Sequence, residues 1–178
     1  MENQPKLWTI GHSTLPIDEF IATLKSFEIR TVVDVRSFPG SRRYPQYNKE
    51  RLRAELAEAE VQYLHYPKLG GRRRAKPDSL NMSWRNEMFR GYADHMETGD
   101  FYDGITDLLT TANLQRTTIM CAEAVWWRCH RSLISDYLKA KGIEVTHIMG
   151  IGKSEAHPFT SAARIVDGQL SYHGILDK

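Results

Sequence analysis

Residues 120–133, MCAEAVWWRCHRSL, hold both cysteines of the chain together with side chains that can modify a thiol. Cys121 lies at the end of an apolar run, and Cys129 lies directly before a segment with helical spacing. Amides at a helix start and nearby arginine or histidine side chains lower the pKa of a thiol. Each cysteine therefore has two interpretations: a thiolate nucleophile, or an inert thiol that fills the core or the loop.

The same stretch supplies groups that could bind or process an anion. His130 and Arg131 open the expected helix, where backbone N–H groups favour an anionic ligand. Glu123 could act as a general acid or base, or it could form an ordinary ion pair with an arginine. Trp126 and Trp127 could stack on the ring of a ligand, although one of them could instead anchor the loop. The stretch therefore predicts a ligand-facing loop between a strand and a helix.

A second group of candidates accompanies the β-branched segment TVVDVR. Asp34 and Arg36 are two positions apart, so they share a face of the expected strand. Because Asp34 lies within an apolar run, it needs a partner, and we consider it an orienting or catalytic carboxylate. Ser41, Arg42 and Arg43 follow in the next loop. Together with Arg36, these arginines could bind phosphate oxygens through bidentate hydrogen bonds.

Two further clusters contain a histidine and a pair of glycines. His12 ends the first apolar segment and could be an acid, a base, a metal ligand or a satisfied hydrogen-bonding residue. Gly70 and Gly71 precede three arginines, and adjacent glycines either let amides approach an anionic ligand or form a simple turn. The cysteines and histidines of these clusters lack the spacing of zinc motifs, and nucleotide-binding fingerprints are absent. We therefore expect no metal and no cofactor.

The elements that would position these residues alternate along the chain. We expect strands at 7–13, 31–36, 61–66, 117–123 and 144–150, helices at 16–27, 49–60, 83–99, 101–112 and 130–142, and a β-hairpin at 163–173. This order predicts a single α/β domain over residues 1–178, with a mainly parallel central sheet flanked by helices and a C-terminal β-hairpin. Ligands bind at the carboxyl ends of parallel strands, so the clusters that follow the five strands should converge. The fifth of these clusters contains Gly150, Gly152 and Lys153.

Composition and charge limit the class of protein and its partners. The chain has 178 residues, of which 41% are hydrophobic and 26% charged, as in ordinary globular proteins. It contains no run of roughly 18 apolar residues and no signal-peptide core, so we expect a cytoplasmic protein that does not enter membranes. The segment from Arg30 to Arg90 contains eleven arginines and three lysines but only seven acidic residues. This basic segment predicts an anionic small molecule or nucleic acid as partner.

Several motifs, in this order, resemble domain-of-unknown-function family 488, a prokaryotic family. They are GHST, VVDVRSFPGSRR, YPKLGG and CAEAVWWRCHRSLISDYL, and the resemblance covers roughly residues 7–150. It implies a compact cytosolic α/β domain without an established activity. VVDVR and IMCAE…HRSLISDYLKAKGIEV are also similar to segments of rhodanese-like domains. In those domains the loop after the cysteine is tight, whereas nine residues separate Cys121 from Arg131 here, which argues against a persulfide mechanism.

Three functions stay open at this point. The first is an enzyme that acts on an anionic substrate, with arginines binding phosphate and Glu123 or Asp34 exchanging protons, assisted by His12. The second is cysteine chemistry, either rhodanese-like sulfur transfer or phosphatase-like attack. The third is a non-catalytic module that binds nucleic acid through the arginines of the basic segment, with strongly salt-dependent affinity.

Overall fold

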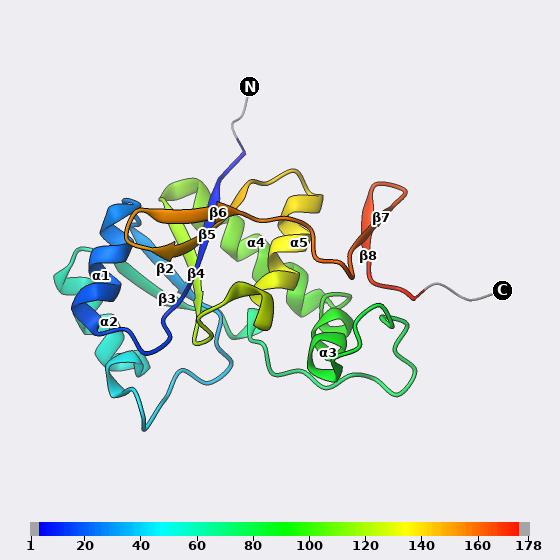
Figure 1. The fold of residues 1–178 in the computed structure, drawn as a ribbon, viewed down its shortest axis with the longest axis horizontal. Coiled ribbons are helices and arrows are strands. Elements are labelled where there is room, and N and C mark those ends of the chain that lie inside the picture. The colour runs from blue at the N-terminus through cyan, green and yellow to red at the C-terminus, as the bar shows by residue number, and fades with distance from the viewer. Residues whose placement is uncertain (1–3, 175–178) are drawn as a thin grey trace.

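The computed structural model describes residues 4–174 and has an α/β architecture around one six-stranded sheet (Figure 1). Residues 1–3 and 175–178, the ends of the predicted domain, lie outside the described residues. The strands are β1 (Leu7–Gly11), β2 (Thr31–Asp34), β3 (Gln62–His65), β4 (Thr117–Cys121), β5 (Val145–Gly150) and β6 (Lys153–Ala156). Their order across the sheet is β3-β2-β4-β1-β5-β6. The first five strands are parallel, and β6 pairs antiparallel with β5.

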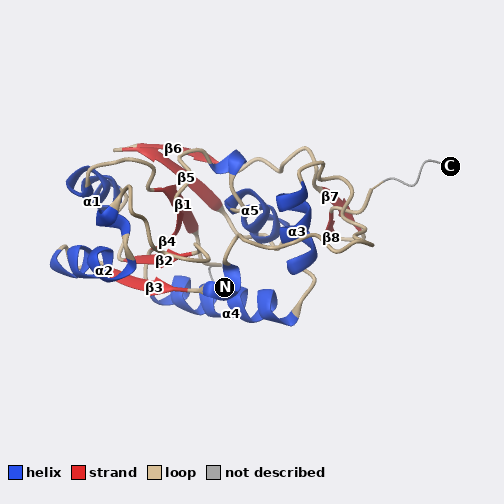
Figure 2. Cartoon of the chain, turned by 90° about the horizontal axis from the view of Figure 1, so that it is seen from below, coloured by secondary structure: helices blue, strands red, loops and turns tan. Residues whose placement is uncertain are grey.

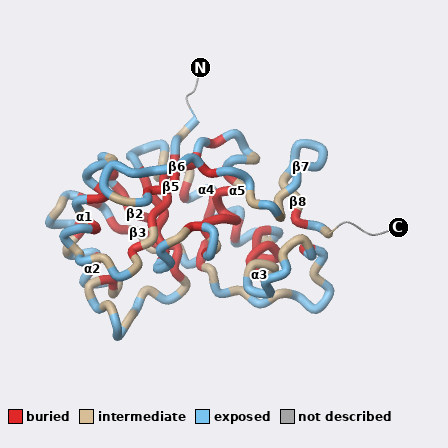
Figure 3. The backbone as a smooth tube through the Cα atoms, viewed as in Figure 1, coloured by how far each residue is buried: buried red, intermediate tan, exposed pale blue. Residues whose placement is uncertain are grey.

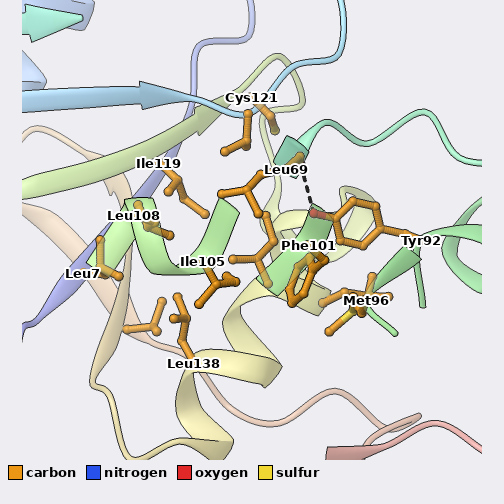
Figure 4. Close-up of a cluster of buried hydrophobic side chains, with 14 of the residues drawn as sticks. Leu7, Leu69, Tyr92, Met96, Phe101, Ile105, Leu108, Ile119, Cys121 and Leu138 are labelled. Atoms are coloured by element: carbon orange, nitrogen blue, oxygen red, sulfur yellow. Dashed lines mark hydrogen bonds between the residues drawn. The ribbon is translucent and has the colours of Figure 1, made fainter. Parts of the chain in front are cut away.

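Helices cover both faces of the sheet. They are α1 (Ile17–Ser26), α2 (Lys49–Glu58), α3 (Glu87–His95), α4 (Gly99–Leu114) and α5 (Arg131–Ala140), with 3-10 turns η1 (Pro45–Tyr47), η2 (Pro67–Leu69) and η3 (Trp126–Arg128). Figure 2 shows α1 and α2 on one side of the sheet and α4 and α5 on the other. Successive side chains of a strand point to opposite faces. Accordingly, Ile119 packs in the cluster with α4 and α5 (Figure 4), whereas Met120 packs in the cluster with α1 and α2.

Local sequence explains where several helices begin. The side chain of Asn86 accepts hydrogen bonds from the first-turn amides of α3, and Thr98 accepts one from an amide of α4. Such N-caps satisfy amides that have no partner within the helix. Asp18 and Glu19 lie in the first turn of α1, where negative charge is favourable. The mainly parallel sheet with helices on both faces confirms the α/β fold expected from the sequence.

The predicted C-terminal hairpin is also confirmed. It consists of β7 (Arg164–Val166) and β8 (Gln169–Ser171), and it forms a separate two-stranded sheet. The turn residues Asp167 and Gly168 have φ values of 52° and 78°, as a type I′ turn requires. Beyond the hairpin, Tyr172 is buried, and its hydroxyl donates to Asp136 Oδ2 of α5 at 2.7 Å.

Several details differ from the expectation; the helix predicted at 83–99, for example, is present only as α3 over Glu87–His95. The strand β6 was not predicted because its sequence, KSEA, has no apolar residue larger than alanine and all four side chains are exposed at the sheet edge. Predicted strand 31–36 ends at Asp34, where the chain turns to bring Arg36 back to that carboxylate. Cys129 was expected to be the N-cap of α5, but η3 extends the preceding loop and His130 takes that position. Within residues 4–174, no helix is long and apolar enough to cross a membrane.

The topology creates a crevice at the centre of the sheet. Neighbouring strands β1 and β4 lead to helices on opposite faces, α1 after β1 and α5 after β4. Their connections therefore diverge at the carboxyl ends, which is where open α/β sheets bind ligands. The tube in Figure 3 is buried along these central strands and exposed along many of the surrounding loops.

Candidate active site

A pocket of about 380 Å³ lies at the carboxyl ends of β1, β2 and β4. Its lining comprises His12, Arg36, Ser37, Phe38, Gly40, Ser41, Tyr44, Gly71, Arg72, Met88, Phe89, Cys121, Ala122, Glu123, Arg128, Cys129 and His130. Four of the five clusters expected to converge contribute to it. The fifth cluster, at residues 150–153, lies apart because β5 pairs with β1 only over its first three residues and then continues into the hairpin with β6.

The two cysteines contact each other in the pocket. Cys121 is the last residue of β4, Cys129 immediately precedes the N-cap of α5, and their Sγ atoms are 2.7 Å apart. Both are free thiols and both are buried. Cys129 Sγ also accepts a hydrogen bond from the backbone N–H of Arg131 at 3.3 Å. A sulfur atom at a helix start that receives such hydrogen bonds is stabilised as a thiolate.

The environments of the two thiols shift their pKa values in opposite directions. Burial alone would raise the pKa of Cys129, but the Cys121 hydrogen bond, the charge of Arg131 and its backbone N–H lower this pKa to about 7. Burial and the hydrogen bond to Cys129 raise the pKa of Cys121 well above the ordinary value. Cys129 is therefore the thiol that ionises near neutral pH, with Cys121 protonated beside it.

Arg131 is a buried cation that contacts the thiols. Its side chain is 1% exposed, and Nε donates to Cys121 Sγ at 3.0 Å. Nη1 donates to Thr9 Oγ1 at 3.0 Å, and Nη2 donates to the Glu123 carbonyl oxygen at 2.7 Å. Within residues 4–174, no carboxylate forms a salt bridge with this guanidinium. A buried charge without a carboxylate is costly, so a thiolate next to it is strongly favoured.

Behind Arg131, buried polar side chains form a continuous hydrogen-bonded chain. Thr9 Oγ1 lies 2.6 Å from His147 Nδ1, and His147 Nε2 lies 2.8 Å from His157 Nδ1. His157 Nε2 lies 2.8 Å from Asp136 Oδ1. Arg131 donates to Thr9 at one end of the chain, and Asp136 accepts at the other. When both histidines are neutral, Thr9 donates to His147, His147 donates to His157 and His157 donates to Asp136. Burial is the main cause that lowers the pKa of His147 to about 2, consistent with a neutral ring.

His130 links the thiols to the end of β2. Its Nε2–H donates to the carbonyl oxygen of Val35 at 2.8 Å, which leaves Nδ1 as an acceptor 3.5 Å from Cys129 Sγ. Burial lowers the pKa of His130. The neutral imidazole therefore presents an acceptor for the Cys129 thiol proton.

Asp34 and Arg36 form the ion pair that their spacing suggested. Arg36 Nε and Nη2 donate to the two carboxylate oxygens of Asp34 at 2.9 and 2.8 Å, and Tyr63 also donates to this carboxylate. Burial opposes the charge of Arg36, but hydrogen bonding to Asp34 outweighs it and raises the pKa of Arg36. Asp34 is fully buried and absent from the pocket lining. In this position Asp34 holds the Arg36 side chain and does not itself line the pocket.

His12 lines the pocket directly after the end of β1. Its Nδ1–H donates to the Ser13 carbonyl at 2.9 Å, Nε2 lies 3.3 Å from Arg36 Nη1, and the ring stacks on Tyr47 with centroids 4.0 Å apart. Burial is the main cause that lowers the pKa of His12 to about 4. His12 is therefore neutral at pH 7, and both ring nitrogens have partners.

The outer part of the pocket combines free charges with apolar surface. Arg72 and Arg128 are exposed and form no salt bridge within the described residues. Phe38 and Met88 are 72% and 62% exposed, and the Arg72 guanidinium lies 5.5 Å from the Phe38 ring centroid. Glu123 is also exposed here, and its carboxylate has no hydrogen-bond or ionic partner among residues 4–174. The pocket therefore offers two cations, an acid–base group and an apolar wall above the thiols.

Close packing of backbone against side chains fixes this arrangement. A Cβ added at Gly11 would lie 1.8 Å from the Glu123 carbonyl oxygen and 2.8 Å from Arg131 Nη2. A Cβ at Gly71 would lie 2.5 Å from His130 Nδ1. Gly71 therefore leaves room for the imidazole. The amide of Gly70 donates to the Pro67 carbonyl and is not free for an anion.

The remaining predicted residues have different places. Trp126 is buried, stacks on His147 with centroids 4.4 Å apart and donates through Nε1 to Glu155, so it anchors the loop. Trp127 is 50% exposed and lies outside the pocket lining. Arg42 and Arg43 are exposed and lie between lining residues without lining the pocket themselves. Ser41 lines the pocket, and its hydroxyl oxygen accepts from the Tyr44 amide at 3.0 Å.

Several site residues were missed by sequence reasoning. The chain from Thr9 through His147 and His157 to Asp136 was not anticipated, although polar residues within apolar strand and helix patterns were a signal for it. The apolar wall was missed because Phe38 lies in a loop without periodicity. Within residues 4–174, no group of three or more His, Cys, Asp or Glu side chains is arranged to hold a metal ion.

Comparisons with known proteins identify a family but no activity. The family model described as Domain of unknown function DUF488 matches residues 16–138. This range includes both cysteines, Arg131 and Asp136, whereas His147 and His157 follow it. Neither a search of curated proteins nor a search of solved structures found a match.

Proposed function

The chain belongs to the DUF488 family, a domain of unknown function, and we propose that it is an enzyme whose nucleophile is the Cys129 thiolate and whose substrate carries an anionic group. One observation carries the proposal. Arg131, a buried cation that has no carboxylate partner among residues 4–174, holds the two thiols at the floor of a pocket at the carboxyl ends of the strands. A thiolate is the nucleophilic form of cysteine, and a pKa near 7 makes it abundant at neutral pH.

The other side chains have roles that follow from their positions. When Cys129 is protonated, His130 Nδ1 is placed to accept the thiol proton. Arg72 and Arg128 supply positive charge that attracts an anionic substrate. Glu123 lines the pocket, its carboxylate has no partner within the described residues, and it is the candidate to exchange a proton with the leaving group. Arg131 acts on the thiols from behind, since it is buried and does not line the pocket.

Two anionic test substrates separate the possible thiol reactions. The protein is incubated with p-nitrophenyl phosphate, a phosphoryl donor, or with thiosulfate and cyanide, which report sulfur transfer. We expect turnover of one of them and a covalent adduct on Cys129, detected by mass spectrometry after an acid quench. Cys129→Ser should abolish both, whereas Cys129-independent turnover of either substrate contradicts the proposal. Glu123→Gln should lower turnover without preventing the adduct.

A non-catalytic nucleic-acid-binding role is the second candidate, and it is favoured by the exposed arginines near the pocket. Arg42 and Arg43 lie in the loop that lines it, and Arg74 follows the lining residue Arg72. Each phosphate contact releases counterions, so affinity should fall steeply as salt rises. Binding of a short single-stranded DNA at two salt concentrations tests this role. Binding that persists in Cys129→Ser and disappears when these arginines are replaced would favour it over catalysis.

A further inference from the structure

The second thiol has no part in a reaction that needs only one nucleophile. Cys121 lines the same pocket, and its Sγ contacts both Cys129 Sγ at 2.7 Å and Arg131 Nε at 3.0 Å. The position of Cys121 at the end of β4 is fixed by the sheet, whereas Cys129 lies at the junction between the loop and α5. Two thiols that contact each other and line the same pocket, one at a helix start and one at the end of a buried strand, have the arrangement of an attacking and a resolving cysteine.

We infer that Cys121 and Cys129 form a dithiol–disulfide couple and that the site reduces an anionic disulfide by two electrons. This inference rests on the proposed function, because it uses Cys129 as the nucleophile. It adds a substrate class and a role for Cys121.

The reaction balances in two steps. The Cys129 thiolate attacks one sulfur of the substrate disulfide, so a protein–substrate S–S bond forms, the substrate S–S bond breaks and one thiolate leaves. Cys121 then attacks Cys129 Sγ, which forms the Cys121–Cys129 disulfide and releases the second half of the substrate as a thiolate. The proton of Cys121 passes to a departing thiolate. The substrate disulfide is the oxidant, and a low-molecular-weight thiol would restore the dithiol by the reverse exchange.

The surroundings of the thiols support both steps. The Arg131 guanidinium contacts Cys121 Sγ, so it stabilises the thiolate that Cys121 must become in the second step. No backbone rearrangement is needed to bring the two sulfur atoms together, because they are already in contact. Burial of both thiols protects the couple from reaction with bulky partners that cannot enter the pocket.

The pocket wall indicates which disulfides fit. Phe38 and Met88 offer exposed apolar surface, and Arg72 and Arg128 offer positive charge that no carboxylate in the described part of the chain pairs with. A disulfide that carries a carboxylate or phosphate next to an apolar or aromatic group would contact both. The substrate class is therefore a small anionic disulfide with an apolar portion.

The test uses the anionic aromatic disulfide 5,5′-dithiobis(2-nitrobenzoate) as the probe, at one equivalent per reduced, folded chain and neutral pH. We expect the wild type to release two equivalents of thionitrobenzoate, to lose two hydrogens in intact mass and to retain no adduct. Cys121→Ser should release one equivalent and keep a thionitrobenzoate adduct on Cys129. Cys121→Ala is the second variant, in case the serine hydroxyl disturbs packing, and should also stop at the adduct.

The outcomes separate the inference from the proposed function. A wild-type protein that keeps the adduct on Cys129, with no internal disulfide, would overturn the dithiol couple and leave Cys129 as the nucleophile. A folded wild type in which Cys129 does not react at all would overturn both. Release of two equivalents by Cys121→Ser without an adduct would show that another group resolves the mixed disulfide, and would overturn the role of Cys121.

Discussion

Arg131 is the residue whose removal should change the thiol site most. Relative to the ordinary thiol pKa of 9.0, Cys129 is shifted to about 7. Each pKa unit corresponds to about 1.4 kcal/mol, so this shift represents about 3 kcal/mol in favour of the thiolate. A unit charge about 4 Å away contributes about 4 kcal/mol at an effective dielectric constant of about 20. The hydrogen bond with Cys121 is the main cause that lowers this pKa, and the charge of Arg131 is large enough to supply a substantial part of the remainder.

Arg131→Met removes the charge and keeps a similar side-chain stem. Because the Cys121 hydrogen bond and the backbone N–H of residue 131 remain, we expect the pKa of Cys129 to rise by roughly one unit, so the thiolate fraction at pH 7 should fall from about a half to about a tenth. Alkylation by iodoacetamide at pH 7 should then slow by about 5-fold. Arg131→Lys restores a charge but cannot reach Cys121, Thr9 and the Glu123 carbonyl together, so we expect an intermediate rate.

The assay measures the alkylation rate of Cys129 against pH, with mass mapping to separate it from Cys121. Circular dichroism and thermal unfolding establish that each variant is folded, since unpaired groups left behind by the methionine should cost about 1–3 kcal/mol of stability. A folded Arg131→Met protein in which Cys129 still titrates near pH 7 would refute the reasoning, because the helix start and Cys121 would then suffice.

Three further predictions concern the pocket and its supports. Iodoacetate, an anion, should lose rate relative to neutral iodoacetamide in Arg128→Ala but not in Arg42→Ala, since only the first arginine lines the pocket; equal loss in both variants would exclude local attraction. Gly11→Ala should lower the free energy of unfolding by about 2 kcal/mol or more in denaturant titrations, because its Cβ would lie 1.8 Å from a loop carbonyl oxygen. A Cβ added at Gly40 would have no neighbouring atom within 4 Å, so Gly40→Ala is the matched control. His12 has a pKa of about 4 in the folded protein and of 6.5 ordinarily. As the pH falls, the unfolded chain therefore binds a proton at this residue before the folded protein does. Stability should fall by up to about 3 kcal/mol as the pH drops from about 6.5 to about 4, less steeply in His12→Gln.

Local patterns were sufficient for the order of elements and for much of the site. Apolar runs and helical spacing identified β1 to β5, and Asp167–Gly168 identified the hairpin turn. The rule that ligands bind at the carboxyl ends of parallel strands correctly brought the Cys121 and Cys129 loop towards the ends of β1 and β2. The rule failed for the end of β5, because pairing with β6 leads that strand away from the pocket.

Features that depend on partners distant in sequence could not be read from the chain. The sequence left open whether Asp34 was catalytic, and only the positions of Arg36 and Tyr63 show that its oxygens are occupied. Trp126 could have faced a ligand, but His147 from β5 covers its ring. The contact of Arg131 with Thr9 joins residues 122 positions apart. Such contacts follow from strand order, which local periodicity does not determine.

The most direct test of the central claim is the pH dependence of alkylation at each cysteine of the wild-type protein, with and without inorganic phosphate. We expect Cys129 to reach half its maximal rate near pH 7 and to be slowed by phosphate, while Cys121 stays unreactive until the chain unfolds. A Cys129 that titrates near pH 9, or that reacts only after unfolding, would contradict a reactive thiolate in this pocket.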